Sequence, residues 1–64
     1  MNHLKEFRFK RNLSQKEMAN SLNISISFYE KVENGRRNVS MNFAKNFKKV
    51  FPDVDFKEVL NIFL

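Results

Sequence analysis

The chain has no cysteine and no tryptophan, and its 64 residues include one glycine, one proline and one histidine. Without cysteine, it has no disulfide framework, no thiolate metal site and no thiol nucleophile. Nowhere do about 18 apolar residues occur together, as a membrane-spanning helix requires, and the first residues lack the apolar run of a signal peptide. We therefore expect a cytoplasmic protein that does not bind a membrane.

Groups suited to catalysis are scarce as well. His3, the only histidine, stands at a chain end with no metal ligand or nucleophile beside it. The acidic residues form no carboxylate pair, and the sequence contains no phosphate-binding glycine loop. We predict that the protein is not an enzyme, with no metal, no cofactor and no small-molecule substrate.

Charge is unevenly distributed along the chain, which carries a net charge of +5. Residues 1–49 hold eleven basic and four acidic side chains, whereas residues 50–64 hold one basic and three acidic side chains. A basic surface attracts a phosphate backbone, because neutralising phosphates releases counterions. The distribution favours nucleic acid as the partner of the first part of the chain.

Apolar spacing and capping residues divide the chain into five short helices and indicate no strand. Ser14-Gln15-Lys16-Glu17 has the pattern of a capping box, in which the serine and the glutamate each bond the other's backbone N–H. Asn12, Asn23 and Gly35 can take the left-handed conformation that ends a helix. The first three predicted helices are about 2–11, 15–22 and 26–34. The fourth begins at its cap Ser40 and ends before Pro52, and the fifth is about 55–63. We predict an all-α fold in one domain over residues 1–64.

Each predicted helix has an apolar face that indicates the core. The last helix places four apolar residues at positions i, i+3, i+4 and i+7. Ile62 and Leu64 lie at or beyond the edge of that stripe, so they either close the small core or form a dimer contact. The expected core positions are Leu4, Phe7, Met18, Ala19, Leu22, Phe43, Phe47, Val50, Phe51, Phe56, Val59, Leu60 and Phe63.

Two charged residues fall on apolar faces. On a helical wheel, Arg8 lies beside Leu4 and Phe7, and Glu33 lies beside the inner residues of the third helix. Because a buried unpaired charge is costly, we predict a partly buried Arg8–Glu33 ion pair that joins the first and third helices. The alternative is that Arg8 extends to solvent and Glu33 lies at a frayed helix end. Phe9 faces outward, where it covers the acidic tail, contacts a partner or is simply exposed.

The opposite face of the third helix carries polar groups of several kinds. Ser27, Lys31 and Asn34 form one row, with Glu30 beside it and Ile26 at its start. Such groups distinguish base edges in the major groove. Lysine donates to guanine, asparagine bonds adenine, glutamate accepts from cytosine, and an aliphatic group contacts the methyl group of thymine. An ordinary helix face exposed to solvent has the same composition, so composition does not distinguish it from a base-reading face. The position of this face in the chain distinguishes the two. This face follows a three-residue turn between two short helices, the pattern of a helix-turn-helix unit.

Four motifs occur in order along the chain: Leu4-x-x-Phe7-Arg8, Leu13-Ser14-Gln15-x-x-Met18-Ala19, Leu22-Asn23-Ile24-Ser25 and Val32-Glu33-Asn34-Gly35-Arg36-Arg37. At these spacings the chain resembles the Cro/phage-repressor (XRE-type) DNA-binding domain over about residues 4–60. The resemblance implies a compact five-helix repressor-like fold, with the helix-turn-helix unit at about 14–35. It also implies that the third helix, about 26–34, enters the major groove.

The resemblance assigns roles to individual residues. It implies that Ser25, Ile26, Ser27 and Lys31 face the bases, to which the wheel adds Glu30, and that Arg8 and Glu33 are paired. Asn12 and Asn23 stand where the family usually has glycine, and Ile26 stands where long polar side chains are common, which favours a methyl contact there. We expect Phe28 to pack against the following loop or the fourth helix; the alternative is that it contacts the sugar-phosphate edge of the DNA. The implied phosphate-binding residues are Gln15, Asn34, Arg36 and Arg37.

Two functions fit this sequence. The first is a sequence-specific, double-stranded DNA-binding transcriptional regulator of the repressor type, which binds a near-palindromic operator as a homodimer. The second is a protein-interaction module of the same fold, such as an antitoxin or a partner-binding regulator. Salt dependence separates them, because binding to phosphates weakens steeply as salt rises.

Overall fold

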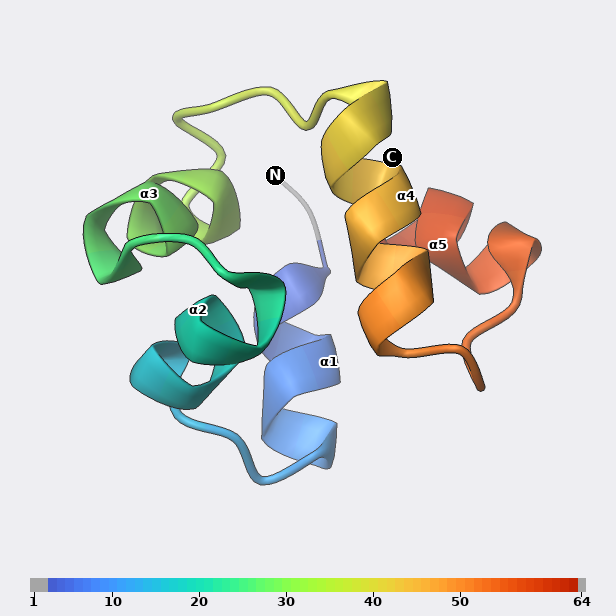
Figure 1. Ribbon diagram of the computed structural model, residues 1–64, viewed down its shortest axis with the longest axis horizontal. Coiled ribbons are helices and arrows are strands. Elements are labelled where there is room, and N and C mark those ends of the chain that lie inside the picture. The colour runs from blue at the N-terminus through green and yellow to red at the C-terminus, as the bar shows by residue number, and fades with distance from the viewer. Residues whose placement is uncertain (1–2, 64) are drawn as a thin grey trace.

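A computed structural model describes residues 3–63 and folds them into five helices, with no strand in that range (Figure 1). The all-α fold is therefore confirmed. The described chain measures 26 × 22 × 19 Å along its principal axes. Its helices are α1 (Leu4–Lys10), α2 (Gln15–Leu22), α3 (Ile26–Glu33), α4 (Met41–Val50) and α5 (Phe56–Phe63).

The helices surround one apolar core. Helix α2 contacts α3 and α4, while α5 contacts α1 and α4 (Figure 1). At the centre, the fully buried ring of Phe47 meets the rings of Phe7, Phe51 and Phe63, with centroids 5.0–5.2 Å apart. The buried apolar residues are Leu4, Phe7, Met18, Ala19, Leu22, Tyr29, Val32, Phe47, Phe51, Val54, Val59 and Ile62.

Helices α2, α3 and α4 begin where the sequence predicts them, each after a capping serine. The hydroxyl oxygens of Ser14, Ser25 and Ser40 each accept a hydrogen bond from the backbone N–H three residues later. The Glu17 carboxylate accepts the Ser14 N–H at 2.9 Å, which completes the capping box. Asp55 similarly accepts the Glu58 N–H, at 2.8 Å, ahead of α5. These bonds satisfy N–H groups that have no partner inside the helix.

The three expected stops share one geometry. Asn12, Asn23 and Gly35 have φ angles of 56°, 58° and 77°, in the left-handed region. After each of them the next backbone N–H returns to a carbonyl in the last turn; Ile24, for example, donates to Ala19 at 3.0 Å. This is the Schellman arrangement, and two of its three instances use asparagine where the resemblance leads one to expect glycine.

Several boundaries differ from the expected ones. Helix α1 is Leu4–Lys10 rather than 2–11, and residues 1 and 2 lie outside the described part of the chain. Helix α3 ends at Glu33, and Asn34 is its C-cap. The difference at α3 arises because the backbone leaves the helix one residue before Gly35.

The expected apolar stripe of α5 is wrong in its orientation. Phe56 and Leu60 are 63% and 41% exposed, whereas Ile62 is 4% exposed and part of the core. The cause is that α5 packs against α1 as well as α4, and the Ile62 carbonyl accepts the His3 N–H at 2.7 Å. Ile62 is therefore not available as a dimer contact. Leu64, the other residue of that expectation, lies outside the described residues.

Candidate nucleic-acid interface

Helices α2 and α3 form the expected helix-turn-helix unit. Asn23 and Ile24 make the turn, and Ser25 caps α3 in an extended conformation. The side-chain N–H of Asn46 in α4 donates to the carbonyl of Leu22 at 2.9 Å, so α4 holds the end of α2. The sequence does not predict this contact of Asn46 with Leu22, because an asparagine on a helix usually faces solvent.

Helix α3 has one buried side and one exposed side. Tyr29, Val32 and Glu33 are buried against the rest of the molecule. The opposite side carries the residues expected to read bases, and all are exposed: Ser25, Ile26, Ser27, Glu30 and Lys31. Ile26 is 39% exposed. The exposed side is therefore open to a partner along the whole helix.

The buried side of α3 is held by charge. The Arg8 guanidinium donates Nε–H to Glu33 Oε2 at 3.0 Å and Nη2–H to Glu33 Oε1 at 3.2 Å. Arg8 Nη1–H donates to the Leu13 carbonyl at 3.0 Å, at the end of the α1–α2 loop. Arg8 and Glu33 are only 8% and 6% exposed. A two-pronged pair of this kind fixes the orientation of α3 relative to α1, since both partners are planar.

The protonation of this pair follows from its neighbours. Burial by itself would raise the pKa of Glu33, but the hydrogen bonds that the carboxylate accepts, first of all from Arg8, outweigh burial and lower it. The hydrogen bond to Glu33 raises the pKa of Arg8. Burial, followed by the neighbouring Glu33 carboxylate, raises the pKa of Tyr29, whose hydroxyl lies in the interior. Both Arg8 and Glu33 are thus charged at neutral pH.

Gln15, expected to bind a phosphate, is tied to the same pair. Its Nε2–H donates to Glu33 Oε1 at 3.3 Å, and the side chain is half-buried at the first position of α2. A glutamine amide has two N–H donors, so one remains for another acceptor. The contact links α2 to the ion pair, and Arg8, Gln15 and Glu33 together join the first three helices.

The residues expected beyond α3 all lie on the surface. Asn34, Arg36 and Arg37 are exposed and follow one another around Gly35. The Lys31 carbonyl accepts the backbone N–H of Arg36 at 2.8 Å and that of Arg37 at 3.3 Å. The two arginines therefore leave the end of α3 at a fixed place.

A comparison with protein families agrees with this geometry. A family model described as helix-turn-helix matches residues 4–59, nearly the whole chain. The chain belongs to the Cro/C1-type (XRE) helix-turn-helix family. This family consists of DNA-binding regulators, which are typically not enzymes. Comparisons with curated proteins and with solved structures gave no match.

The described residues of this Cro/C1-type chain make four arginine–aromatic contacts. The Arg8 guanidinium lies 4.6 Å from the ring of Phe9, which is 57% exposed. Phe9 thus packs on the buried ion pair. Arg11 lies over the ring of Phe7 at 4.8 Å and pairs with Asp53. Arg11 also lies 5.4 Å from the ring of Phe51. The fourth contact joins Arg37 to Phe28. The contacts of Arg8 and Arg11 with Phe9 and Phe7 are local to α1 and its C-cap. The other two join separate segments of the chain and depend on the tertiary structure.

Residues 3–63 contain no group of three or more histidine, cysteine, aspartate or glutamate side chains that could hold a metal ion. Within the same range, every helix is too short or too polar to cross a membrane.

Proposed function

We propose that this protein is a sequence-specific, double-stranded DNA-binding transcriptional regulator of the repressor type, with α3 in the major groove. The observation that carries the proposal is the two-sidedness of α3. Its inner side is fixed because Glu33 accepts hydrogen bonds from Arg8 and Gln15. Its outer side, which carries the expected base readers between Ser25 and Lys31, is exposed. A reading helix needs both properties, because side chains select bases only when their backbone is held in register.

The outer side of α3 supplies the proposed base readers. Lys31 can donate to guanine acceptors and Glu30 can accept from the cytosine amino group. Ser25 and Ser27 are small and can bond to either base of a pair, while Ile26 suits the methyl group of thymine. The sequence preference would therefore come from positions 25–31.

The proposed phosphate contacts flank these readers. Gln15 stands at the start of α2, and Asn34, Arg36 and Arg37 follow the end of α3. Contacts to the DNA backbone carry affinity and register rather than sequence choice. The same proposal places the protein in the cytoplasm with its DNA.

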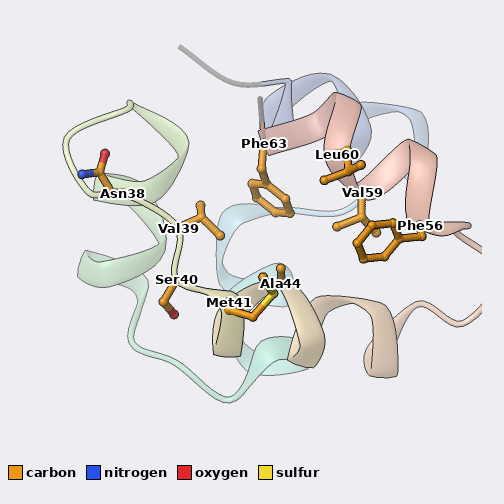
Figure 2. Close-up of a pocket in the computed structure, with 9 residues that line it drawn as sticks. All are labelled: Asn38, Val39, Ser40, Met41, Ala44, Phe56, Val59, Leu60 and Phe63. Carbon is orange, nitrogen blue, oxygen red and sulfur yellow. The ribbon is translucent and has the colours of Figure 1, made fainter.

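We further propose that two copies bind a near-palindromic operator, and that a groove between α4 and α5 joins them (Figure 2). The groove has a volume of about 330 Å³, and the exposed side chains of Met41, Phe56 and Leu60 line it. Exposed apolar patches of this kind are typical of protein contacts. The groove begins at Asn38 and Val39, in the loop that follows the two arginines, so a second copy there would lie close to the same DNA.

The same groove favours a second candidate function, a protein-interaction module such as an antitoxin or a partner-binding regulator. In that case the apolar groove would hold a different protein, and Arg36 and Arg37 would only keep the surface soluble. Binding through an apolar groove changes little with salt, whereas binding to phosphates weakens steeply.

In vitro selection of bound duplexes from a random pool tests the main proposal. We expect one sequence with two related half-sites to be enriched. Lys31→Ala should change the preferred base at one position of each half-site, by about 1–3 kcal/mol of discrimination. Arg36→Ala/Arg37→Ala should instead weaken binding to all duplexes and reduce its salt dependence. A pool without enrichment, together with dispensable arginines, would leave the protein-interaction module as the better account.

A further inference from the structure

Arg36 and Arg37 are adjacent, but their side chains have different surroundings. The Arg37 guanidinium lies over the ring of Phe28, with its central carbon 5.5 Å from the ring centroid. Within the described residues, Arg36 has no such ring contact and no ion pair. The two side chains therefore differ in freedom although they carry the same charge.

The ring of Phe28 is itself held in place. Its backbone N–H donates to the Ser25 hydroxyl at 3.1 Å in the first turn of α3. Its half-buried ring packs against Phe43 of α4 with centroids 6.3 Å apart, and Phe43 packs edge-on against Phe63 at 5.7 Å. Phe28 thus packs against α4 as expected, and one face of its ring carries Arg37.

The backbone of Arg37 is tied to the same helix. Its N–H and that of Arg36 both donate to the carbonyl of Lys31, the last of the proposed base readers. The left-handed conformation of Gly35, with φ of 77°, makes this return possible. Arg37 is therefore anchored to α3 at its backbone and at its guanidinium.

A cation–π contact of this kind leaves N–H donors of the arginine free for other acceptors. A guanidinium on a ring face uses its π surface, while its N–H donors lie in the guanidinium plane and point outward. A planar group held in one orientation can donate two parallel N–H bonds to a phosphate without losing freedom on binding. An unsupported arginine would contribute mainly its charge.

We infer that Phe28 is a positioning residue for DNA binding, which orients the Arg37 guanidinium toward one backbone phosphate in fixed register with α3. The inference rests on the proposed function and deepens it, because it separates two residues that the sequence treats alike. Arg37 is then the oriented phosphate contact, and Arg36 adds unoriented positive charge. Phe28 acts through Arg37 and touches no DNA itself.

A double-mutant cycle tests this inference on the full chain, with a duplex of random sequence as the probe. Phe28→Leu should weaken binding roughly two- to fivefold per copy, the range of one cation–π contact at a partly exposed site. In an Arg37→Ala background the same change should have no further effect. In the matched Arg36→Ala background it should retain its full effect, and Phe28→Tyr, which keeps the ring, should bind like the parent.

Two further measurements guard against a purely structural effect of Phe28→Leu. The denaturation midpoint of each variant reports its folding, and Arg37→Lys avoids the core altogether. Lysine keeps the charge but lacks the planar fork, so Arg37→Lys should lose affinity to a similar extent as Phe28→Leu.

The inference is overturned if Phe28→Leu weakens binding equally with and without Arg37, or if Arg37→Lys binds as tightly as the parent. A parent chain that shows no salt-dependent binding to any duplex would instead overturn the proposed function, and the inference with it. The two failures are thus distinguishable in one set of titrations.

Discussion

Arg8 and Glu33, 25 positions apart in the sequence, meet through two hydrogen bonds of 3.0 and 3.2 Å between α1 and α3. Both are almost completely buried. Neither residue is expected to touch DNA, yet together they set the angle at which the exposed side of α3 is presented. The strongest structural constraint on the proposed reading helix therefore lies on its inner side.

Breaking this pair from one side should cost more than removing it altogether. Arg8→Met leaves the Glu33 carboxylate buried without its two hydrogen bonds from the guanidinium, so we expect a loss of about 3–5 kcal/mol in the free energy of unfolding. Arg8→Met/Glu33→Leu removes both charges and should lose much less. Urea denaturation of the parent, both single variants and the double variant measures the coupling. Equal losses in single and double variants would mean that the pair does not act as a unit.

The pair should also make stability depend on pH. The folded-state pKa of Glu33 lies below its ordinary value of 4.5, so the unfolded chain binds more protons over that interval. The stabilisation is fully present above the ordinary value and is lost as the pH falls through the lowered one. Glu33→Gln should therefore be less stable than the parent at neutral pH, and the difference should shrink as the pH falls.

Denaturation of both proteins between about pH 7 and about pH 3 provides the measurement. Glu17 and Asp53 also have lowered pKa values, the first through the Ser14 backbone and the second through Arg11. Both groups are present in the parent and in Glu33→Gln, so their contributions cancel in the difference. A difference that stays constant over this range would contradict the assignment to Glu33.

The left-handed stop after α3 should tolerate asparagine better than alanine. Gly35→Ala puts a Cβ atom into a conformation with φ of 77°, at a cost of about 1–2 kcal/mol. Gly35→Asn should cost less, because Asn12 and Asn23 already hold the same conformation in this chain. Thermal or urea denaturation ranks the three proteins. If alanine were as stable as glycine, the Schellman geometry at this stop would not contribute to stability.

The groove between α4 and α5 gives a test of the proposed dimer. Leu60→Lys or Phe56→Lys places a charge on the groove, so we expect sedimentation to report a monomer and affinity for a two-half-site duplex to fall by about a hundredfold. Asn61→Lys is the matched control, because it adds the same charge at an exposed position of α5 that does not line the groove. A parent chain that is monomeric both alone and on DNA would refute the dimer without affecting the reading helix.

The sequence predicted the parts of this molecule that depend on a few neighbouring residues. Capping serines and left-handed stops make their hydrogen bonds within one or two turns, so their positions follow from local residue order. The sequence also predicted the ion pair between Arg8 and Glu33. A charge on an apolar helix face needs a partner of opposite charge, and these two residues are such a pair.

The orientation of α5 shows where such reasoning stops. Periodicity placed Phe56 and Leu60 inside and left Ile62 at the edge, but the helix packs against both α1 and α4 and buries Ile62 instead. A helical wheel reports which residues share a face. It does not report how many neighbours the helix has or from which directions they approach.

The sequence by itself thus determined the number of helices, their caps, the helix-turn-helix unit and the side of α3 that stays exposed, because hydrogen bonds within a turn and the amphipathic period are local properties. Only the tertiary structure decided that Gln15 bonds the ion pair, that Phe28 supports Arg37, and that Phe56 and Leu60 line an open groove. Those contacts join residues that are not neighbours in the sequence, and the packing of the whole core sets the distances between them.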